Sequence, residues 1–178
     1  MSDLISKHGG YRRLKSFQMA QLVYDVTVRF CERYIDRFSR TKDQMVQAAR
    51  SGRQNIAEGS QASSTSKKFE IKLTNVARAS LEELLLDYED YLRQHGLPMW
   101  NKDSAEARKV RNLVYIKNRS YSSYRPYMSH SQSAANTAIC IIHQATYLLN
   151  RQLDTLEQQF LETGGFTERL YHARMNAK

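Results

Sequence analysis

An amide and a carboxylate three residues apart give the chain its first candidate for chemistry. Asn55 and Glu58 lie in the string Asn55-Ile56-Ala57-Glu58-Gly59. Residues three apart share one face of a helix, so the two side chains can act together, as an active-site pair or as hydrogen-bond partners between helices or subunits. Gly59 can adopt the left-handed conformation that ends a helix. We interpret Asn55, Glu58 and Gly59 as a structural group at a helix end.

A segment rich in tyrosine and cationic residues is the second candidate. Tyr121 and Tyr124 alternate with Lys117, Arg119 and Arg125. Aromatic rings can stack on unpaired bases while cations hold the phosphates, and this combination serves single-stranded nucleic acid. Alternatively, the tyrosines fold back over the rest of the protein and use their hydroxyl groups at its rim. The segment therefore predicts a nucleic-acid contact, a covering loop, or both if one edge faces outward.

Arginines also follow one predicted helix near the amino end. Arg29, Arg33, Arg37 and Arg40 are spaced by four, four and three residues, which is the spacing of one helical face and its exit turn. Such a row can follow a phosphate backbone, while nearby acidic residues can neutralise part of it as exposed ion pairs of little stability. Two residues of the next predicted helix extend this surface: Arg50 and Arg53.

The charge of the chain is concentrated in two segments. Of a formal net charge of +9 in 178 residues, residues 1–60 hold 11 Lys/Arg against 6 Asp/Glu, and residues 100–130 hold 7 against 2. Localised positive charge favours polyanions through counterion release, and RNA and DNA are the obvious cytoplasmic candidates. The alternative is a solvated surface that only keeps the protein soluble.

Other classes of site have little support in the sequence. The five histidines and two cysteines lack metal-ligand spacing, and there is no glycine-rich phosphate loop and no nucleophile elbow. We therefore predict no metal, no cofactor and no enzymatic activity, with buried thiols at Cys31 and Cys140. No apolar run is long enough to cross a membrane, and the first residues lack the apolar core of a signal peptide. We expect a soluble, cytoplasmic protein without a membrane partner.

Two helical patterns occupy the first third of the chain. The first runs from about Ser16 to Arg37, with apolar residues at three- and four-residue steps. The second begins just after Thr41, at a Thr-x-x-Gln capping box, and closes at Gly59. Small residues along it would let a neighbouring backbone approach closely: Ala48, Ala49, Gly52 and Ala57.

Two further patterns complete an all-α, up-and-down four-helix bundle in a single domain of residues 1–178. The third helix follows the Ser/Thr run 61–66, whose later hydroxyl groups can cap it, and lasts until Gly96. The fourth begins at a second capping box, 129–132, and continues to about residue 164. Its unbroken seam of apolar residues predicts packing at a shallow crossing angle.

An insert of about residues 97–128 separates the third and fourth helices. Asp103 and Glu106 predict an N-cap with a reciprocal acid, followed by a short helix to about Asn118. The remainder, residues 119–127, is predicted as a loop, and Trp100 as an anchor for the insert. The tail, about residues 165–178, is predicted to fray after one possible helical turn.

Three signatures resemble a known family. The segments 55–59 (NIAEG), 66–69 (SKKF) and 80–84 (SLEEL) have the order and spacing of a bacterial four-helix-bundle family. That family contains ribosomal-RNA intervening-sequence proteins and the accessory variability determinant proteins of diversity-generating retroelements. The resemblance covers about residues 17–91 and implies a homopentameric barrel with a basic surface that binds a reverse transcriptase and nucleic acid. The long segment after Gly96 departs from the family pattern.

These observations predict a non-catalytic nucleic-acid-binding and assembly module, with RNA or DNA, further copies of the chain and a reverse transcriptase as expected partners. Two alternatives stay open. One is a scaffold that binds only protein. The other rests on Arg125 and His130, whose separation is similar to the Arg-x-x-x-x-His motif of helical HEPN ribonucleases. That resemblance would make the histidine a proton-transfer group and the arginine a phosphate ligand.

Overall fold

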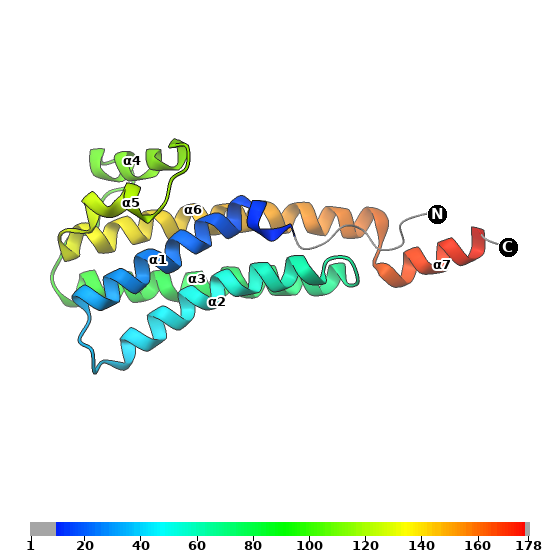
Figure 1. Cartoon of the computed structure of the whole chain (residues 1–178), viewed down its shortest axis with the longest axis horizontal. Helices are drawn as coiled ribbons and strands as arrows, with labels where there is room; N and C mark the ends of the chain where they lie inside the picture. Colours follow the sequence, from blue (N-terminus) through cyan, green and yellow to red (C-terminus); the bar gives the residue numbers. More distant parts are fainter. Residues whose placement is uncertain (1–9, 177–178) are drawn as a thin grey trace.

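The long helices of the chain pack side by side, each against two others. A computed structural model describes residues 10–176, and all regular structure in that range is helical (Figure 1). The long helices are α1 (Lys15–Tyr34), α2 (Arg40–Ala62), α3 (Lys67–Gln94) and α6 (Ser131–Thr163). α2 packs against α1 and α3, and α6 packs against the same two helices. The predicted all-α fold is confirmed.

Shorter helices lie before, between and after the long ones. They are η1 (Tyr11–Arg13), α4 (Ala105–Asn112), η2 (Leu113–Tyr115), α5 (Tyr121–Tyr124), η3 (Arg125–Met128) and α7 (Phe166–Asn176). α4, η2, α5 and η3 make up the insert, which lies at one end of the molecule against α1 and α6 (Figure 1). α7 extends beyond the far end of α6 (Figure 1). No helix in the described range combines the length and apolar character needed to cross a membrane.

The apolar stripes of the long helices meet in a common core. The ring of Phe30 on α1 is fully buried, and its centroid lies 4.9 Å from the centroids of both Tyr88 and Tyr91 on α3. The hydroxyl group of Tyr88 bonds to that of Thr27 at 3.0 Å, so the one polar atom of this buried ring is satisfied. The insert adds its own buried side chains to this core: Ala107, Val110, Tyr124 and Met128.

Two glycines of α2 allow α3 to approach closely. A Cβ atom added to Gly52 would lie 2.5 Å from Cδ2 of Leu81, and one added to Gly59 would lie 3.3 Å from the carbonyl oxygen of Glu70. Ala48 and Ala49 are buried on the same helix. The close approach predicted from the small residues of this helix therefore occurs, and α3 of the same chain is the neighbour.

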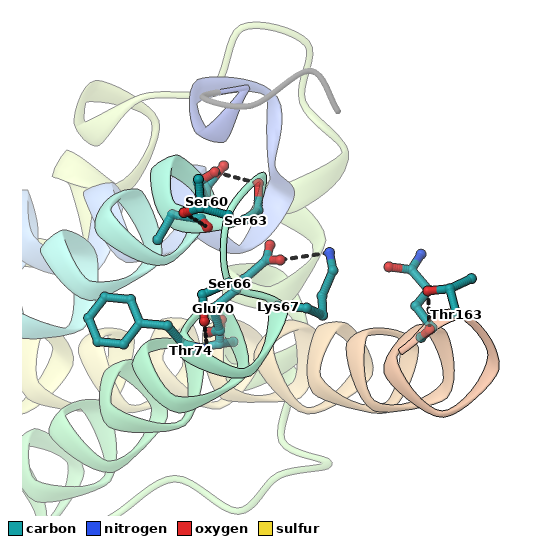
Figure 2. A network of polar contacts seen from close by, with 11 residues as sticks. Ser60, Ser63, Ser66, Lys67, Glu70, Thr74 and Thr163 are labelled. Atoms are coloured by element: carbon teal, nitrogen blue, oxygen red, sulfur yellow. Dashed lines mark hydrogen bonds and ion pairs between the residues drawn. The ribbon is translucent and has the colours of Figure 1, made fainter. Parts of the chain in front are cut away.

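A polar network closes the turn between α2 and α3 (Figure 2). The side chain of Ser66 accepts the backbone N–H of Phe69 at 3.1 Å and caps α3. The carboxylate of Glu70, which is almost fully buried, pairs with the ammonium of Lys67 at 2.8 Å. The hydroxyl group of Ser63 donates to the carbonyl of Ser60 at 2.7 Å. The prediction that a late hydroxyl of the Ser/Thr run caps the third helix is confirmed.

Three predicted boundaries of α1 and α2 are wrong. α1 ends at Tyr34 and not at Arg37, because the next residue, Ile35, has an extended backbone. α2 begins at Arg40 with Ser39 as its N-cap, so the predicted capping box at Thr41 is not formed. α2 also continues past Gly59 to Ala62. Gly59 is buried beneath α3, and extending the helix retains that packing.

The insert and the tail are more helical than predicted. Ser104 caps α4 in place of Asp103, and α4 ends at Asn112. Residues 119–127 do not form a simple loop, since α5 and η3 occupy most of them, and Pro126 fits the first turn of η3. His130 is the N-cap of α6 with no side-chain bond, so the second predicted capping box is absent. α7 replaces the predicted frayed turn.

Side chains of α6 hold the insert by its backbone. Asn136 accepts the backbone N–H of Trp100 at 2.7 Å and donates to the carbonyl of Pro98 at 3.1 Å. Gln144 donates to the carbonyl of Arg111 at 3.1 Å. Trp100 also packs against the core, as predicted for an anchor. The insert is therefore fixed to the long helices along its length.

Candidate functional site

The arginine row predicted near the amino end is divided between two helices. Arg29 and Arg33 lie near the end of α1, Arg37 lies in the turn that follows, and Arg40 is the first residue of α2. All four side chains are exposed. The row is not a single helical face, because α1 ends at Tyr34. The short turn nevertheless keeps the four cations at the end where the two helices meet.

Little of the positive charge in this row is compensated. Arg29 pairs with Glu32 at 3.0 Å, with side-chain exposures of 61% and 49%, and such an exposed pair contributes little stability. The guanidinium of Arg37 lies 4.5 Å from the ring centroid of Phe38, which is 78% exposed. Within residues 10–176, the other three arginines of the row form no ion pair. Their charge remains available to a partner.

Arg50 and Arg53 have different environments on α2. Arg50 is exposed, whereas Arg53 is half-buried. The guanidinium of Arg53 lies 4.4 Å from the ring centroid of Tyr24 and donates to the side-chain oxygen of Gln21 at 3.1 Å. Arg53 thus joins α2 to α1, and only Arg50 extends the exposed row.

The predicted cations of the insert also include both exposed side chains and one that is bound to protein atoms. Lys117 and Arg125 are exposed. Arg119 is half-buried, with one nitrogen donating to the carbonyl of Val114 at 3.1 Å and another 3.4 Å from the sulfur of Met19. Arg119 therefore holds the insert against α1, and its guanidinium is already engaged by protein atoms.

The two predicted tyrosine contacts also differ. Tyr124 is fully buried, so the prediction that its ring binds nucleic acid is wrong. Because residues around it fold into α5 and η3, its ring packs into the core as the covering-loop alternative expects. Tyr121 is half-buried and lines a surface groove. A third ring, Tyr115, is 84% exposed.

The structure brings the arginine row and the insert together. The hydroxyl group of Tyr34, at the end of α1, donates to the carbonyl of Met128 at 2.7 Å, and Nη1 of Arg33 lies 3.5 Å from the same oxygen. Burial raises the pKa of the Tyr34 hydroxyl, which favours the protonated form that donates this bond. The exposed Arg125 belongs to η3, the element that ends at Met128. The two predicted groups therefore form one continuous region.

The carboxyl-terminal half of α3 carries the opposite charge. Burial, together with the neighbouring carboxylates of Glu83 and Asp90, raises the pKa of Asp87. Asp87 and Asp90 line a hollow beside the turn between α1 and α2, together with Asp36 of that turn. The positive region is therefore bounded by an acidic one, and it covers only part of the surface.

A groove lies between the start of α1 and the insert. Its volume is about 530 Å³, and its walls come from η1, α1 and residues 118–121. On the α1 side, Phe17, Gln18, Gln21 and Asp25 line it. The sequence analysis singled out Arg119 and Tyr121 of the insert wall but missed the α1 wall, because the two walls are about 100 residues apart in the chain and the α1 residues carry no recognisable motif.

The backbone at Asn118 shapes the insert side of this groove. Asn118 has φ of 58°, and it is the only residue other than glycine with positive φ within the described range. Asparagine tolerates this left-handed conformation better than most residues. The resulting turn places Arg119, Ser120 and Tyr121 along the groove.

Asn55 and Glu58 do not act as a pair. Asn55 donates to the carbonyl and hydroxyl oxygens of Ser51 at 2.9 Å and 3.0 Å, and the hydroxyl of Ser51 lies 2.9 Å from that of Ser80 on α3. Glu58 is exposed. Asn55 therefore stabilises the contact between α2 and α3 through Ser51, and Gly59 serves their close packing.

Arg125 and His130 are both exposed, on η3 and at the N-cap of α6. Neither residue lines the groove or the hollows beside α2. Among residues 10–176, no group of three or more His, Cys, Asp or Glu side chains is placed to hold a metal ion. Cys31 and Cys140 are buried thiols, as predicted.

Comparisons of the chain with protein-family models, with curated proteins and with solved structures find no match. The function is therefore inferred from the exposed cations and from their position beside the insert.

Proposed function

We propose that this chain is a non-catalytic nucleic-acid-binding and assembly module. The observation that carries the proposal is the group of exposed arginines where α1 meets α2. Arg33, Arg37 and Arg40 form no ion pair within the described residues, and Arg125 is exposed on the element that contacts the end of α1. Binding to a phosphate backbone by counterion release requires such cations. The net charge of +9 acts in the same direction.

In this proposal the long helices form an up-and-down four-helix bundle, with the insert between its third and fourth helices. The packing of each long helix against two others supports this arrangement. The rigid helices fix the spacing of the arginines, so the surface can follow a backbone of regular phosphates. Because these residues contact phosphates, they bind RNA and DNA without regard to base sequence.

The assembly part of the proposal rests on the family resemblance and on exposed apolar side chains. Phe69, Val76 and Leu86 of α3 are 46%, 39% and 62% exposed, and self-association would bury them. The small residues of α2 give little support to self-association, because Gly52 packs against α3 of the same chain and Ala48 and Ala49 are already buried. A homopentamer and a reverse transcriptase partner follow from the resemblance alone.

A salt series of mobility shifts tests nucleic-acid binding. Labelled duplex DNA and RNA are titrated with the protein between about 50 and 200 mM salt, where phosphate-dominated affinity falls steeply. A triple variant, Arg33→Ala, Arg37→Ala and Arg40→Ala, is expected to lower the slope of log K against log salt by about 2–3. The matched control removes three exposed cations elsewhere: Lys68→Ala, Lys72→Ala and Arg151→Ala. The control should retain most of the slope.

The outcomes separate the proposal from its alternatives. Absence of any binding at 50 mM salt would leave the scaffold that binds only protein. Equal loss in both triple variants would mean that net charge alone, and not the arginine row, attracts the ligand. Cleavage of labelled RNA by the unaltered protein would contradict the non-catalytic assignment.

Light scattering tests the assembly. A pentamer of a 20.7 kDa chain has a mass of about 100 kDa. Substitution of Leu86→Lys, which places a charge on the exposed apolar part of α3, should reduce that mass without lowering the helix content. A monomeric wild-type protein would contradict this part of the proposal.

A further inference from the structure

The groove between the start of α1 and the insert has the size and lining of a small ligand site. Its volume of about 530 Å³ lies within the range of pockets that hold drug-sized molecules. Two aromatic rings, Phe17 from α1 and Tyr121 from the insert, line it, and both are half-buried. The groove therefore offers apolar ring surface that is partly shielded from water and accessible to a planar ligand.

The polar groups in this groove are arranged for a neutral base with N–H groups. Asp25 accepts a bond from the amide of Gln21 at 2.9 Å. An ionised carboxylate has about four acceptor positions, so Asp25 retains capacity for further donors. The amide of Gln21 is fixed on its other side by Arg53, whose guanidinium donates to its oxygen at 3.1 Å. This chain of bonds holds the carboxylate in a fixed position.

One exposed cation lines the groove, and a second lies next to its insert wall in the sequence. Arg12, from η1, is exposed and lines the groove on the side of α1. Lys117 is exposed directly before the segment that forms the insert wall. Arg119 donates to the carbonyl of Val114, so its guanidinium is engaged. The exposed side chains of Arg12 and Lys117 therefore remain to contact phosphates. A base in the groove would therefore have cations near the phosphates on either side of it.

We propose that this groove binds one unpaired nucleobase of a single-stranded nucleic acid. The ring of Tyr121 stacks on the base, Asp25 accepts its N–H groups, and Arg12 and Lys117 contact the flanking phosphates. Guanine fits best, because its N1–H and its amino group lie side by side and a carboxylate can accept both. A base in a duplex cannot enter, since both faces are stacked and its N–H groups are paired. The inference rests on the proposed nucleic-acid binding and adds a preference for single strands.

Fluorescence anisotropy with labelled single strands tests the groove. The probes are 12-nucleotide RNA and DNA strands of uracil or thymine only, the same strands with one central guanine, and a blunt duplex of equal length. The wild-type protein should bind the guanine strand about tenfold more tightly than the uracil strand. Equal affinities for the RNA and DNA strands would indicate recognition of the base alone. Tighter binding of RNA than of DNA would indicate an additional contact to the 2′-hydroxyl.

Three variants and a matched control test which residues of the groove bind the strand. Tyr121→Ala should weaken binding of single strands about tenfold while Tyr121→Phe preserves it, because stacking needs only the ring. Asp25→Asn keeps the shape but replaces one of the two acceptor oxygens with an NH2 donor. The side chain can then no longer accept both N–H groups of guanine, so the ratio of guanine to uracil affinity should fall toward one. Tyr147→Ala on α6, which is 59% exposed in wild type, is the matched control and should change neither quantity. Thermal unfolding checks each variant for a folded structure, and Asp25→Asn keeps the test informative if Tyr121→Ala does not fold.

The results distinguish this inference from the proposed function. Equal affinity for single strands and duplex, or an unchanged guanine ratio in Asp25→Asn, would overturn the groove as a base site while the arginine row could still bind phosphates. No binding of any probe would overturn both. A cross-link from a 4-thiouracil strand to residues 118–121 would support the groove directly, and cross-links confined to α6 would contradict it.

Discussion

Gly52 shows how a single side chain sets the distance between two helices. The Cβ of an alanine at this position would lie 2.5 Å from Cδ2 and 2.8 Å from Cγ of Leu81, which is itself fully buried. Alanine favours a helix over glycine by about 1 kcal/mol, but overpacking a core costs about 1–3 kcal/mol. We therefore expect Gly52→Ala to lower the free energy of unfolding by up to about 2 kcal/mol, as measured by urea denaturation.

A variant of another glycine and a variant of Leu81 provide the controls. Gly10→Ala meets only the end of the Arg13 side chain, at 3.8 Å, so its free energy of unfolding should stay within about 0.5 kcal/mol of wild type. The cost of Gly52→Ala should shrink in the background of Leu81→Ala, because the clash is removed. A Gly52→Ala protein about 1 kcal/mol more stable than wild type, which is the gain from helix propensity alone, would contradict the close approach of α2 and α3.

The buried thiol of Cys31 predicts a loss of stability at high pH. Burial raises the pKa of Cys31 from 9.0 to about 12. Between these values the unfolded chain has released the thiol proton and the folded chain has not, so rising pH favours unfolding. From this thiol we expect the free energy of unfolding to fall by about 1 kcal/mol between pH 9 and pH 10. Below pH 9 the thiol should have little effect on the pH dependence.

Urea denaturation of Cys31→Ala across the same pH range isolates this contribution. The variant loses packing at every pH, so its absolute stability is lower, but its slope between pH 9 and pH 10 should be flatter than that of wild type. The buried Tyr88 and Cys140, whose pKa values are also raised by burial, remain as a common background. Identical slopes would show that the thiol has the same pKa in both states.

Arg119 makes one of the contacts that hold the insert to the long helices. This side chain joins the carbonyl of Val114 to the sulfur of Met19 on α1. Arg119→Ala should release this part of the insert while the long helices remain packed, at a cost of about 1.5–3 kcal/mol for a lost charged hydrogen bond. Hydrogen exchange should then accelerate in residues 113–124 and stay unchanged in α3.

Lys117→Ala is the matched control for this prediction, because Lys117 is exposed and lies in the same segment. Its exchange pattern should equal that of wild type. Faster exchange throughout α1 and α6 in Arg119→Ala would mean that the insert and the long helices unfold as one unit. Unchanged exchange in residues 113–124 would mean that the core contacts of Tyr124 hold the insert without Arg119.

The sequence predicts the long helices better than their ends. Periodic apolar residues identify all four, because the core selects them at every turn. Helix ends depend on which of several nearby residues caps the helix and on tertiary packing, and the apolar pattern contains neither. Ser39, and not Thr41, caps α2. Gly59 continues α2 because α3 covers it. The same limit applies to residues 119–127, whose helical turns form because the core accepts Tyr124.

The sequence could predict only those residues of the candidate site whose solvent exposure follows from their residue type. Arg33, Arg37 and Arg40 are exposed, as charged residues on a helix end are expected to be. The engagement of Arg53 by Tyr24 and the groove beside Phe17 depend on tertiary contacts between helices, which no spacing in the chain encodes. The family resemblance could not supply the groove either, because one of its walls belongs to the insert, which departs from the family pattern.

Within residues 10–176, a region rich in exposed cations lies beside an acidic one. Exposed cations gather at the end of α1, the start of α2 and the insert, whereas the carboxyl-terminal half of α3 is acidic. A polyanion would therefore approach the molecule from one side, guided by the field of the cations and repelled by Asp87 and Asp90. Under the proposed function, this polarity would orient the phosphate backbone along the row and toward the groove.

The far end of the molecule is expected to be dispensable for its stability. α7 has no buried residue and extends beyond α6 (Figure 1). Its start is stabilised locally, where the backbone N–H of Gly165 donates to Glu168 at 2.9 Å. A chain that ends at residue 164 should therefore keep its melting temperature within about 2 °C of wild type, as measured by circular dichroism, since little apolar surface leaves the core. Light scattering on the same sample shows whether assembly is retained. A loss of 5 °C or more at unchanged mass would contradict the independence of α7, and a fall in mass would place α7 in the contact between copies.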